Sequence, residues 1–243
     1  MVSGGLFCSA KLHDNYFNSL HTKTSLQQKF ICYNRSMNTY VYSIEDDAEN
    51  AQTLYVNLTN KCSNNCVFCI RTTVDDIKGK NMWLEDENFS AEDVLEQFKN
   101  FNTPKEVVFC GYGEPLMKFD ILKEVATVLK QKGIKIRINT NGTGNIINKK
   151  NIVPELAKFT DEISISLNAP TQEQYEEISK PKFKNTFAEM LDFTKKSVEN
   201  NIKTTLTVVD EYSDYKLDIP ACKKIADEIG ADFRVRKWIS NGY

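Results

Sequence analysis

The sequence predicts an α/β protein built on a partial (β/α)6 barrel, an open parallel sheet with helices outside and a polar lumen. Three observations lead to this prediction. Strand-like and helix-like segments alternate from residue 54 onward, six segments have strand character, and their residues alternate between apolar and polar. A helix between successive strands makes a right-handed crossover, so the strands are expected to be parallel neighbours.

The strands and helices are recognised from their periodicity and from the residues that bound them. The predicted strands are 53–59, 106–110, 134–139, 162–168, 203–209 and 232–238. The predicted helical segments are 90–101, 119–133, 153–159, 171–200 and 221–230. Ser90 and Asp93 have the spacing of a capping box, and Gly133 and Gly230 are typical helix C-termini.

The alternation of residue types along the strands predicts the lumen. Strands of a parallel sheet that is buried on both faces are usually apolar throughout. Here one face is apolar, for example Ile163 and Ile165, and the other is polar, for example Ser164 and Ser166. We expect the apolar face to meet the helices and the polar face to line a concave space for a polar ligand. The alternative is a sheet with one face open to solvent.

Composition and charge exclude several classes of protein. The 243 residues are 26% charged and 41% hydrophobic, which is typical of a globular chain, and the net charge of −2 gives no indication of nucleic acid. The sequence contains no apolar run of about 18 residues, so a membrane span is not predicted. The N-terminus lacks the apolar segment of a secretory signal. Seven cysteines, three of them crowded together, favour metal binding or catalysis in a reducing compartment, so we expect a cytoplasmic protein.

Two regions differ in their patterning. Residues 1–36 show no clear period, and we predict a poorly ordered N-terminal extension. Residues 37–243 are predicted to form the barrel domain. The stretch 71–90 is long for a connection between a strand and a helix, and it is interpreted either as a lid or as a poorly ordered surface loop.

Three cysteines, Cys62, Cys66 and Cys69, follow the first predicted strand with C-x₃-C-x₂-C spacing. Parallel α/β folds place their chemistry at the carboxyl ends of strands, so this loop is a candidate metal site. Structural zinc takes four Cys or His ligands, but no histidine lies beyond residue 36, and Cys110 and Cys222 are isolated. Three thiolates on a 4Fe-4S cluster would leave one iron open to another molecule. Zinc stays the alternative.

The three-cysteine motif, with Phe68 as the aromatic residue before Cys69, resembles the signature of the radical SAM superfamily. In that family the open iron is chelated by the amino and carboxylate groups of S-adenosylmethionine. One electron from the reduced cluster breaks a sulfur–carbon bond and releases a 5′-deoxyadenosyl radical, which takes a hydrogen atom from the substrate. The resemblance covers about residues 40–243, and the family fold is a partial (β/α)6 barrel.

The text GYGEP that begins at Gly111 resembles the family's G-G-E-P loop. There glycines let the backbone approach the cofactor's amino group and the glutamate accepts a hydrogen bond from it. The resemblance therefore implies that Gly111, Gly113 and Glu114 bind the cofactor. Tyr112 departs from the pattern, because it replaces the first glycine of the usual pair. The structural alternative for Glu114 is an acid in a first helical turn.

Further cofactor contacts are implied at the ends of later strands. Asn139, in the text NTNG, corresponds to a contact with the methionine or ribose, although NTNG is also a turn signal. Ser166 and Asn168, in SISLN, match ribose and methionine contacts, and their alternatives are a satisfied hydroxyl and an Asx-turn. Phe68 is expected to lie against the adenine, or else simply to pack the loop.

The resemblance implies an enzyme that needs an external one-electron reductant, flavodoxin- or ferredoxin-like, and a substrate that the sequence does not identify. The subgroup with the most similar text is the TatD-associated radical SAM proteins, because of TNKCSNNCVFCIR, FCGYGEPL, ISISLNAPT and ACKKIADEIGADFRVR. A glycyl-radical activase, a small-molecule mutase or cyclase, and a peptide modifier all stay open. The other candidate functions are an iron–sulfur electron-transfer or cluster-carrier protein that does not cleave S-adenosylmethionine, and a zinc-binding interaction module.

The last predicted strand carries two arginines on its polar face. Arg234 and Arg236 alternate with Phe233 and Val235, so both guanidinium groups are expected to enter the lumen. Guanidinium binds carboxylate or phosphate through two oxygens. The sequence therefore predicts a substrate that bears a carboxylate or a phosphate. The alternative is an edge strand with solvated arginines.

Overall fold

The computed structural model describes residues 38–213 and 215–239. The predicted N-terminal extension, residues 1–36, lies outside the described residues. No helix in the described part of the chain is long and apolar enough to cross a membrane.

A seven-stranded sheet forms the centre of the described region. Its order is β1 (Val41–Tyr42), β2 (Thr53–Val56), β5 (Glu106–Phe109), β6 (Lys135–Thr140), β7 (Glu162–Ser166), β8 (Lys203–Asp210) and β9 (Asp232–Lys237). All neighbours are parallel except β1, which is antiparallel to β2. The predicted α/β fold with six parallel strands in chain order is therefore confirmed, and β1 adds one short strand at the edge.

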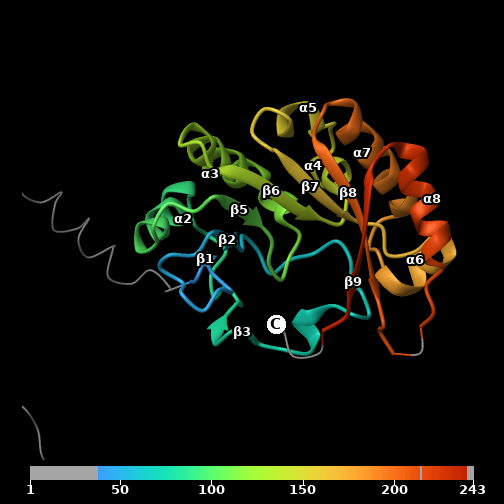
Figure 1. Cartoon of the computed structure of the whole chain (residues 1–243), viewed down its shortest axis with the longest axis horizontal. Helices are drawn as coiled ribbons and strands as arrows, with labels where there is room; N and C mark the ends of the chain where they lie inside the picture. The colour runs from blue at the N-terminus through green and yellow to red at the C-terminus, as the bar shows by residue number, and fades with distance from the viewer. Residues whose placement is uncertain (1–37, 214, 240–243) are drawn as a thin grey trace, which may run out of the picture. The chain divides into compact units, whose positions relative to one another are not determined.

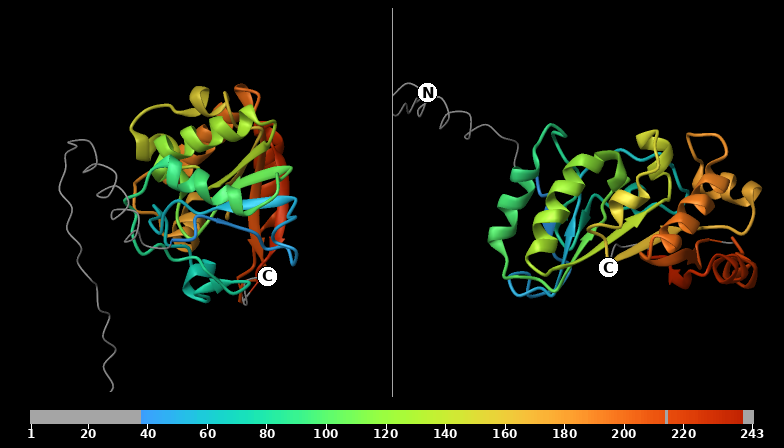
Figure 2. Two further views of the ribbon diagram at one scale, coloured as in Figure 1. Left: turned by 90° about the vertical axis from the view of Figure 1, so that its left-hand side faces the viewer. Right: turned by 90° about the horizontal axis from the view of Figure 1, so that it is seen from above.

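Helices cover one face of this sheet (Figures 1 and 2). They are α2 (Ala91–Gln97), α3 (Phe119–Gln131), α4 (Gly144–Asn148), α5 (Val153–Leu156), α6 (Gln172–Ser179), α7 (Thr186–Glu199) and α8 (Ile219–Ile229). Three short 3₁₀ helices accompany them: η1 (Ile70–Thr72), η2 (Phe98–Asn100) and η3 (Pro115–Lys118). The predicted capping box of Ser90 and Asp93 is present at the start of α2.

The predicted helical segment 171–200 is two helices, and this is a correction. Between α6 and α7, Lys180 and Asn185 adopt left-handed conformations with φ of 42° and 56°. Pro181 lacks a backbone N–H and cannot continue the hydrogen bonding of α6. The break turns residues 180–185 into a connection at the carboxyl end of the sheet, where it meets the cysteine loop.

The apolar face of the sheet packs into the main core. Leu54, Ile136, Ile163 and Leu206 are fully buried there. On the opposite face the register aligns Asn139 with Ser164 and Ser164 with Thr205. The apolar pattern weakens at β9, where Val235 is 42% exposed, because an edge strand has a neighbour on one side only.

The stretch 71–90 is folded. It contains the hairpin of β3 (Asp76–Ile77) and β4 (Lys80–Asn81), which lies below the sheet in the view of Figure 1, while α3, α5 and α7 lie above it. A second small core of Tyr42, Ile77, Met82 and Tyr112 holds this segment. Of the two interpretations made from the sequence, the poorly ordered loop is therefore wrong.

Candidate metal centre and cofactor site

The cysteine loop runs from the end of β2 to η1 and is held by main-chain hydrogen bonds. Asn65 N donates to Ser179 O at 3.0 Å, and Val67 N donates to Ile178 O at 2.9 Å. Lys182 N donates to Ser63 O at 2.8 Å. The carboxyl end of α6 thus braces the loop, and the spacing of the cysteines is fixed by protein contacts.

The three thiols share a poorly solvated space. Burial, followed by the charge of Glu114, raises the pKa of Cys62. Burial also raises the pKa of Cys66 to about 12, and the neighbouring Cys62 and Cys69 thiolates add to this rise. Deprotonation of one thiol makes deprotonation of the next less favourable. This is expected of a group of thiols that are deprotonated only when they bind a cation.

A zinc ion and an iron–sulfur cluster need different things from the three thiols. A zinc ion needs four ligands around one point, whereas a cluster binds each thiolate on a different iron. In the described residues, no group of three or more His, Cys, Asp or Glu side chains is arranged around a single metal ion.

Close chain packing explains the glycines of the GYGEP loop. A Cβ at Gly113 would lie 2.3 Å from Thr59 O and 2.4 Å from Lys61 O. A Cβ at Gly111 would lie 2.0 Å from the side-chain oxygen of Asn57. Neither position has room for a side chain, because both glycines pack against the segment that leads from β2 to Cys62. The sequence alone does not reveal this reason for the two glycines.

Tyr112, the departure from the family pattern, has a structural role. Its hydroxyl donates to Val74 O at 2.7 Å, and its ring meets Trp83 edge-on at 4.9 Å. Its carbonyl accepts from Arg71, which also donates to Asn60 O at 3.2 Å. Tyr112 therefore anchors the stretch 71–90 beneath the site.

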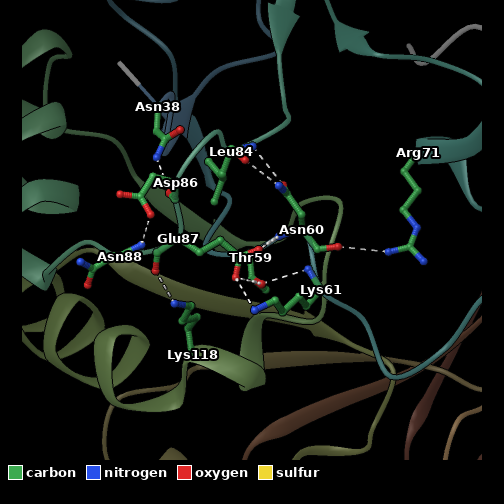
Figure 3. Close-up of polar contacts among 10 residues, drawn as sticks. All are labelled: Asn38, Thr59, Asn60, Lys61, Arg71, Leu84, Asp86, Glu87, Asn88 and Lys118. Atoms are coloured by element: carbon green, nitrogen blue, oxygen red, sulfur yellow. Dashed lines mark hydrogen bonds and ion pairs between the residues drawn. The ribbon is translucent and has the colours of Figure 1, made fainter. Parts of the chain in front are cut away.

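A polar network ties the end of that stretch to the start of the cysteine loop (Figure 3). Asn60 and Leu84 exchange two hydrogen bonds at 2.7 and 3.0 Å. The Glu87 carboxylate accepts from Asn60 N at 2.9 Å and from the Thr59 hydroxyl at 3.0 Å. Lys118, at the end of η3, donates to Glu87 O at 2.6 Å. Two chain segments about 25 residues apart are thereby held together next to Cys62.

Glu114 is the most deeply buried acid of the site, with 2% of its surface exposed. It accepts from Leu116 N at 3.1 Å, the Thr140 hydroxyl at 2.7 Å and Asn141 N at 2.8 Å. Burial raises the pKa of Glu114 to about 7, although these three hydrogen bonds oppose the rise. A carboxylate has about four acceptor positions, so one stays available to a further donor.

Asn141 is a site residue that the sequence reasoning missed. Its side-chain amide donates to Ser63 Oγ at 2.7 Å and lies 3.6 Å from Cys62 Sγ. It lies two residues after Asn139 in the segment NTNG, where the sequence predicts a cofactor contact at Asn139 or a turn. The side chain of Asn141 points at the thiol, while that of Asn139 lies beside Cys110.

Three asparagines present unpaired acceptor oxygens at this end of the sheet. In the described residues, the Oδ1 atoms of Asn64, Asn139 and Asn168 are buried without a hydrogen-bond donor. Asn168 has a left-handed φ of 63°, and its amide donates to Ser179 Oγ at 3.0 Å. Ser166 ends β7 and is half-buried. Buried acceptors without donors are costly, so these oxygens indicate a ligand that carries donors.

Phe68 belongs to an aromatic cluster. Its ring centroid lies 6.1 Å from that of Tyr212, which lies 5.2 Å from Trp238. The Trp238 indole donates to Phe68 O at 3.3 Å. Tyr212 and Trp238 were not singled out from the sequence, because each becomes relevant only when β8 and β9 end beside the cysteine loop.

The arginines of β9 are exposed. The register pairs Arg234 with Thr207 of the polar face. Burial raises the pKa of Cys110, and the Asn139 side chain and the charges of Arg236 and Arg137 oppose that rise. The charge of Arg236 is thus one of the causes that oppose the rise in the pKa of Cys110, the residue that follows β5.

The sequence of the chain is similar to that of one protein family and of several known enzymes. A family model described as the Radical SAM superfamily matches residues 56–215. The chain is 26% identical over 153 residues to a probable dual-specificity RNA methyltransferase RlmN of Aquifex aeolicus, covering 59% of this chain and 41% of that protein. It is also 26% identical over 160 residues to a 7-carboxy-7-deazaguanine synthase of Methanocaldococcus jannaschii, covering 62% and 61%.

Solved structures share the fold. Streptococcus suis SuiB bound to S-adenosylmethionine superposes with a TM-score of 0.58 at 20% identity, covering 96% of this chain and 47% of that one. The anSMEcpe enzyme with bound AdoMet gives 0.53 at 18% identity, covering 76% and 50%. The chain spans less than two thirds of each of these proteins and of the curated relatives it matches.

Proposed function

The chain belongs to the radical SAM superfamily, and on that premise we propose that Cys62, Cys66 and Cys69 hold its 4Fe-4S cluster and that the surrounding loops bind S-adenosylmethionine. Membership makes the protein an enzyme that uses these two cofactors, as the bound S-adenosylmethionine in structures of the same fold illustrates. The subgroup of TatD-associated proteins stays a prediction from the sequence.

The residues of the site fit both cofactors. Thiolates are the usual ligands of iron–sulfur clusters, and the loop offers three of them. S-adenosylmethionine carries an ammonium and two ribose hydroxyls, all of them donors. The unpaired oxygens of Asn64, Asn139 and Asn168 are acceptors, and Glu114 has one acceptor position left. This match of donors with buried unpaired acceptors is the observation that supports the proposal best.

When bound and reduced, the two cofactors together supply a 5′-deoxyadenosyl radical that abstracts a hydrogen atom from the substrate. The protein's own residues bind and orient. We assign Glu114 to the ammonium, Asn139, Ser166 and Asn168 to the methionine and ribose, and Phe68 to the adenine.

The glycines and Asn141 have supporting roles in this proposal. Gly111 and Gly113 allow the Glu114 loop to approach the cysteine loop. Asn141 connects the two directly, since its backbone N–H donates to Glu114 and its side chain lies against Cys62 Sγ. A hydrogen-bond donor at a ligating sulfur is a recognised means of setting a cluster's potential.

Anaerobic reconstitution with iron and sulfide tests the enzyme against the electron-carrier alternative. After dithionite and S-adenosylmethionine are added, we expect 5′-deoxyadenosine to form, and none without dithionite. A carrier protein has no need for unpaired acceptors around its thiols. A cluster-loaded protein that accepts an electron but yields no 5′-deoxyadenosine would support the carrier.

For the substrate, we retain an anionic group bound by Arg234 and Arg236, supported by the register of β9, which pairs Arg234 with Thr207 of the polar face. Iodoacetate carries a carboxylate and iodoacetamide does not, so the ratio of their alkylation rates at Cys110 reports the local field. We expect Arg236→Gln and Arg234→Gln each to lower that ratio, Arg236→Gln by roughly threefold to tenfold. Mass spectrometry of the Cys110 peptide measures it, with Lys237→Gln as the control. An unchanged ratio in both arginine variants would identify β9 as a solvated edge.

A further inference from the structure

The connection between α6 and α7, residues 180–185, presents an unusual surface. Lys180, Lys182 and Lys184 are all exposed, and Phe183 between them is 38% exposed. Phe183 is among only three large hydrophobic side chains that are exposed in the described part of the chain. Aromatic side chains are enriched in protein-binding surfaces, and a group of lysines attracts an acidic partner.

This surface lies directly against the cysteine loop. Lys182 Nζ donates to the carbonyl of Cys62 at 2.9 Å, and Lys182 N donates to Ser63 O at 2.8 Å. Asn65 N, one residue before Cys66, donates to Lys180 O at 3.2 Å. Lys61, whose side chain is 76% exposed, immediately precedes Cys62. The backbone around Cys62 and Cys66 is thus hydrogen-bonded directly to Lys182 and Lys180.

Three of the four lysines of this surface have no ion pair in the described structure. Lysines on the helices pair with acids one turn away, as Lys196 does with Asp192 and Lys223 with Asp227. Among the residues that the structure describes, no carboxylate lies within ion-pair distance of Lys180, Lys182 or Lys184. Lys61 reaches Glu87 only at 3.9 Å. The patch is therefore positive on a chain whose net charge is −2.

We propose that Lys61, Lys180, Lys182, Lys184 and Phe183 form the docking surface for an acidic one-electron reductant protein of the flavodoxin or ferredoxin class. The proposal rests on the proposed function, because it places the cluster at the cysteine loop. One electron leaves the reduced partner and enters the cluster, and no bond is made or broken. A positive surface raises the encounter rate with an acidic partner, and its position over Cys62 and Cys66 brings that partner next to the acceptor.

A charge-reversal experiment tests this surface. The variant Lys180→Glu with Lys184→Glu changes the patch and leaves Lys182, which bonds to the cysteine loop. Lys132→Glu with Lys149→Glu is the matched control: both lysines are exposed, neither has an ion pair in the described structure, and Lys149, like Lys180, has a left-handed φ, 53°. Cluster-loaded proteins are mixed anaerobically with a photoreduced acidic flavodoxin, and the loss of visible cluster absorbance is followed by stopped flow.

At about 50 mM salt we expect the patch variant to be reduced about tenfold more slowly than the wild type, and the difference to vanish near 500 mM salt, where surface charges are screened. Dithionite is a small anion that needs no docking, so its rate should fall far less than the flavodoxin rate in the patch variant and should be unchanged in the control variant. Equal flavodoxin rates, an equal loss in the control variant, or an equal loss with dithionite would overturn the docking role.

A nucleic-acid partner is the other chemistry that a basic surface could serve, and it is tested with a structured RNA. RNA binding that depends on Lys180 and Lys184, together with an unchanged flavodoxin rate, would overturn the proposal and assign the surface to nucleic acid. Iron, sulfide and 5′-deoxyadenosine are measured first with dithionite. Failure of the proposed function would therefore appear as a missing cluster or product, separately from failure of docking.

Discussion

Cys62→Ala, Cys66→Ala and Cys69→Ala are each expected to abolish assembly of the cluster, reducing bound iron from about four atoms per chain to nearly none. With only two thiolates left, the cluster would lack a protein ligand at two irons. Because main-chain bonds to α6 hold the loop in place, we expect the variants to keep the fold and lose only the metal. Iron and sulfide analysis with visible absorbance measures the loss, and circular dichroism checks the fold.

Cys110→Ala and Cys222→Ala are the matched controls. Cys110 lies at the end of β5, and Cys222 is buried in α8, where removing the sulfur costs about 1 kcal/mol of stability. Both should bind a full complement of iron. If one of them lost the cluster while a member of the triad proved dispensable, the assignment of the three ligands would be wrong.

Glu114→Gln is expected to weaken binding of S-adenosylmethionine by about 1.5–3 kcal/mol, the range of a hydrogen bond to a charged group. That corresponds to roughly a 10- to 150-fold higher Kd. The variant keeps the size of the side chain but removes the negative charge that we pair with the ammonium. Equilibrium binding to the cluster-loaded protein measures the change, and Glu124→Gln, on the exposed surface of α3, is the control. Unchanged affinity with an intact cluster would remove Glu114 from the cofactor site.

The same carboxyl predicts a pH dependence of stability in the apoprotein. Burial raises the pKa of Glu114 from 4.5 to about 7. Between these values the folded protein holds a proton that the unfolded chain has released, so stability falls as pH rises through this window. The full difference is on the order of 3 kcal/mol, equivalent to roughly 6–12 °C in Tm for a chain of this size. The thiols with raised pKa values titrate above this range.

Thermal unfolding at pH 5 and pH 8 measures this dependence. The wild type should lose stability over this interval relative to Glu114→Gln, which has no proton to release there. Conversely, a bound ammonium favours the ionised carboxylate, so affinity for S-adenosylmethionine should rise from pH 6 to pH 8 in the wild type and stay flat in the variant. Parallel curves for the two proteins would show that Glu114 is already ionised near pH 5.

Local patterns in the sequence predicted the fold, which the structure confirms, and the three metal ligands, which stay a prediction. Apolar and polar residues alternate in segments such as 162–168, and helix-like segments separate these from one another. This pattern is a local property of neighbouring residues, and it predicted the six parallel strands. The C-x₃-C-x₂-C spacing is likewise local, and it places Cys62 and Cys69 close enough to raise the pKa of Cys66. Residues a few positions apart must lie near each other in any fold, so their chemistry can be inferred from the text.

Contacts between segments far apart in the sequence depend on how the chain packs in three dimensions. Asn141 reaches Cys62 across 79 positions, and Lys182 reaches the carbonyl of Cys62 across 120. The choice between Asn139 and Asn141 at the thiol depends on how the end of β6 turns toward the cysteine loop. The basic surface exists because Pro181 and the left-handed Lys180 end α6 beside that loop. Such contacts arise from the packing of loops on a closed core, and no period or spacing in the sequence encodes which of many polar side chains will meet.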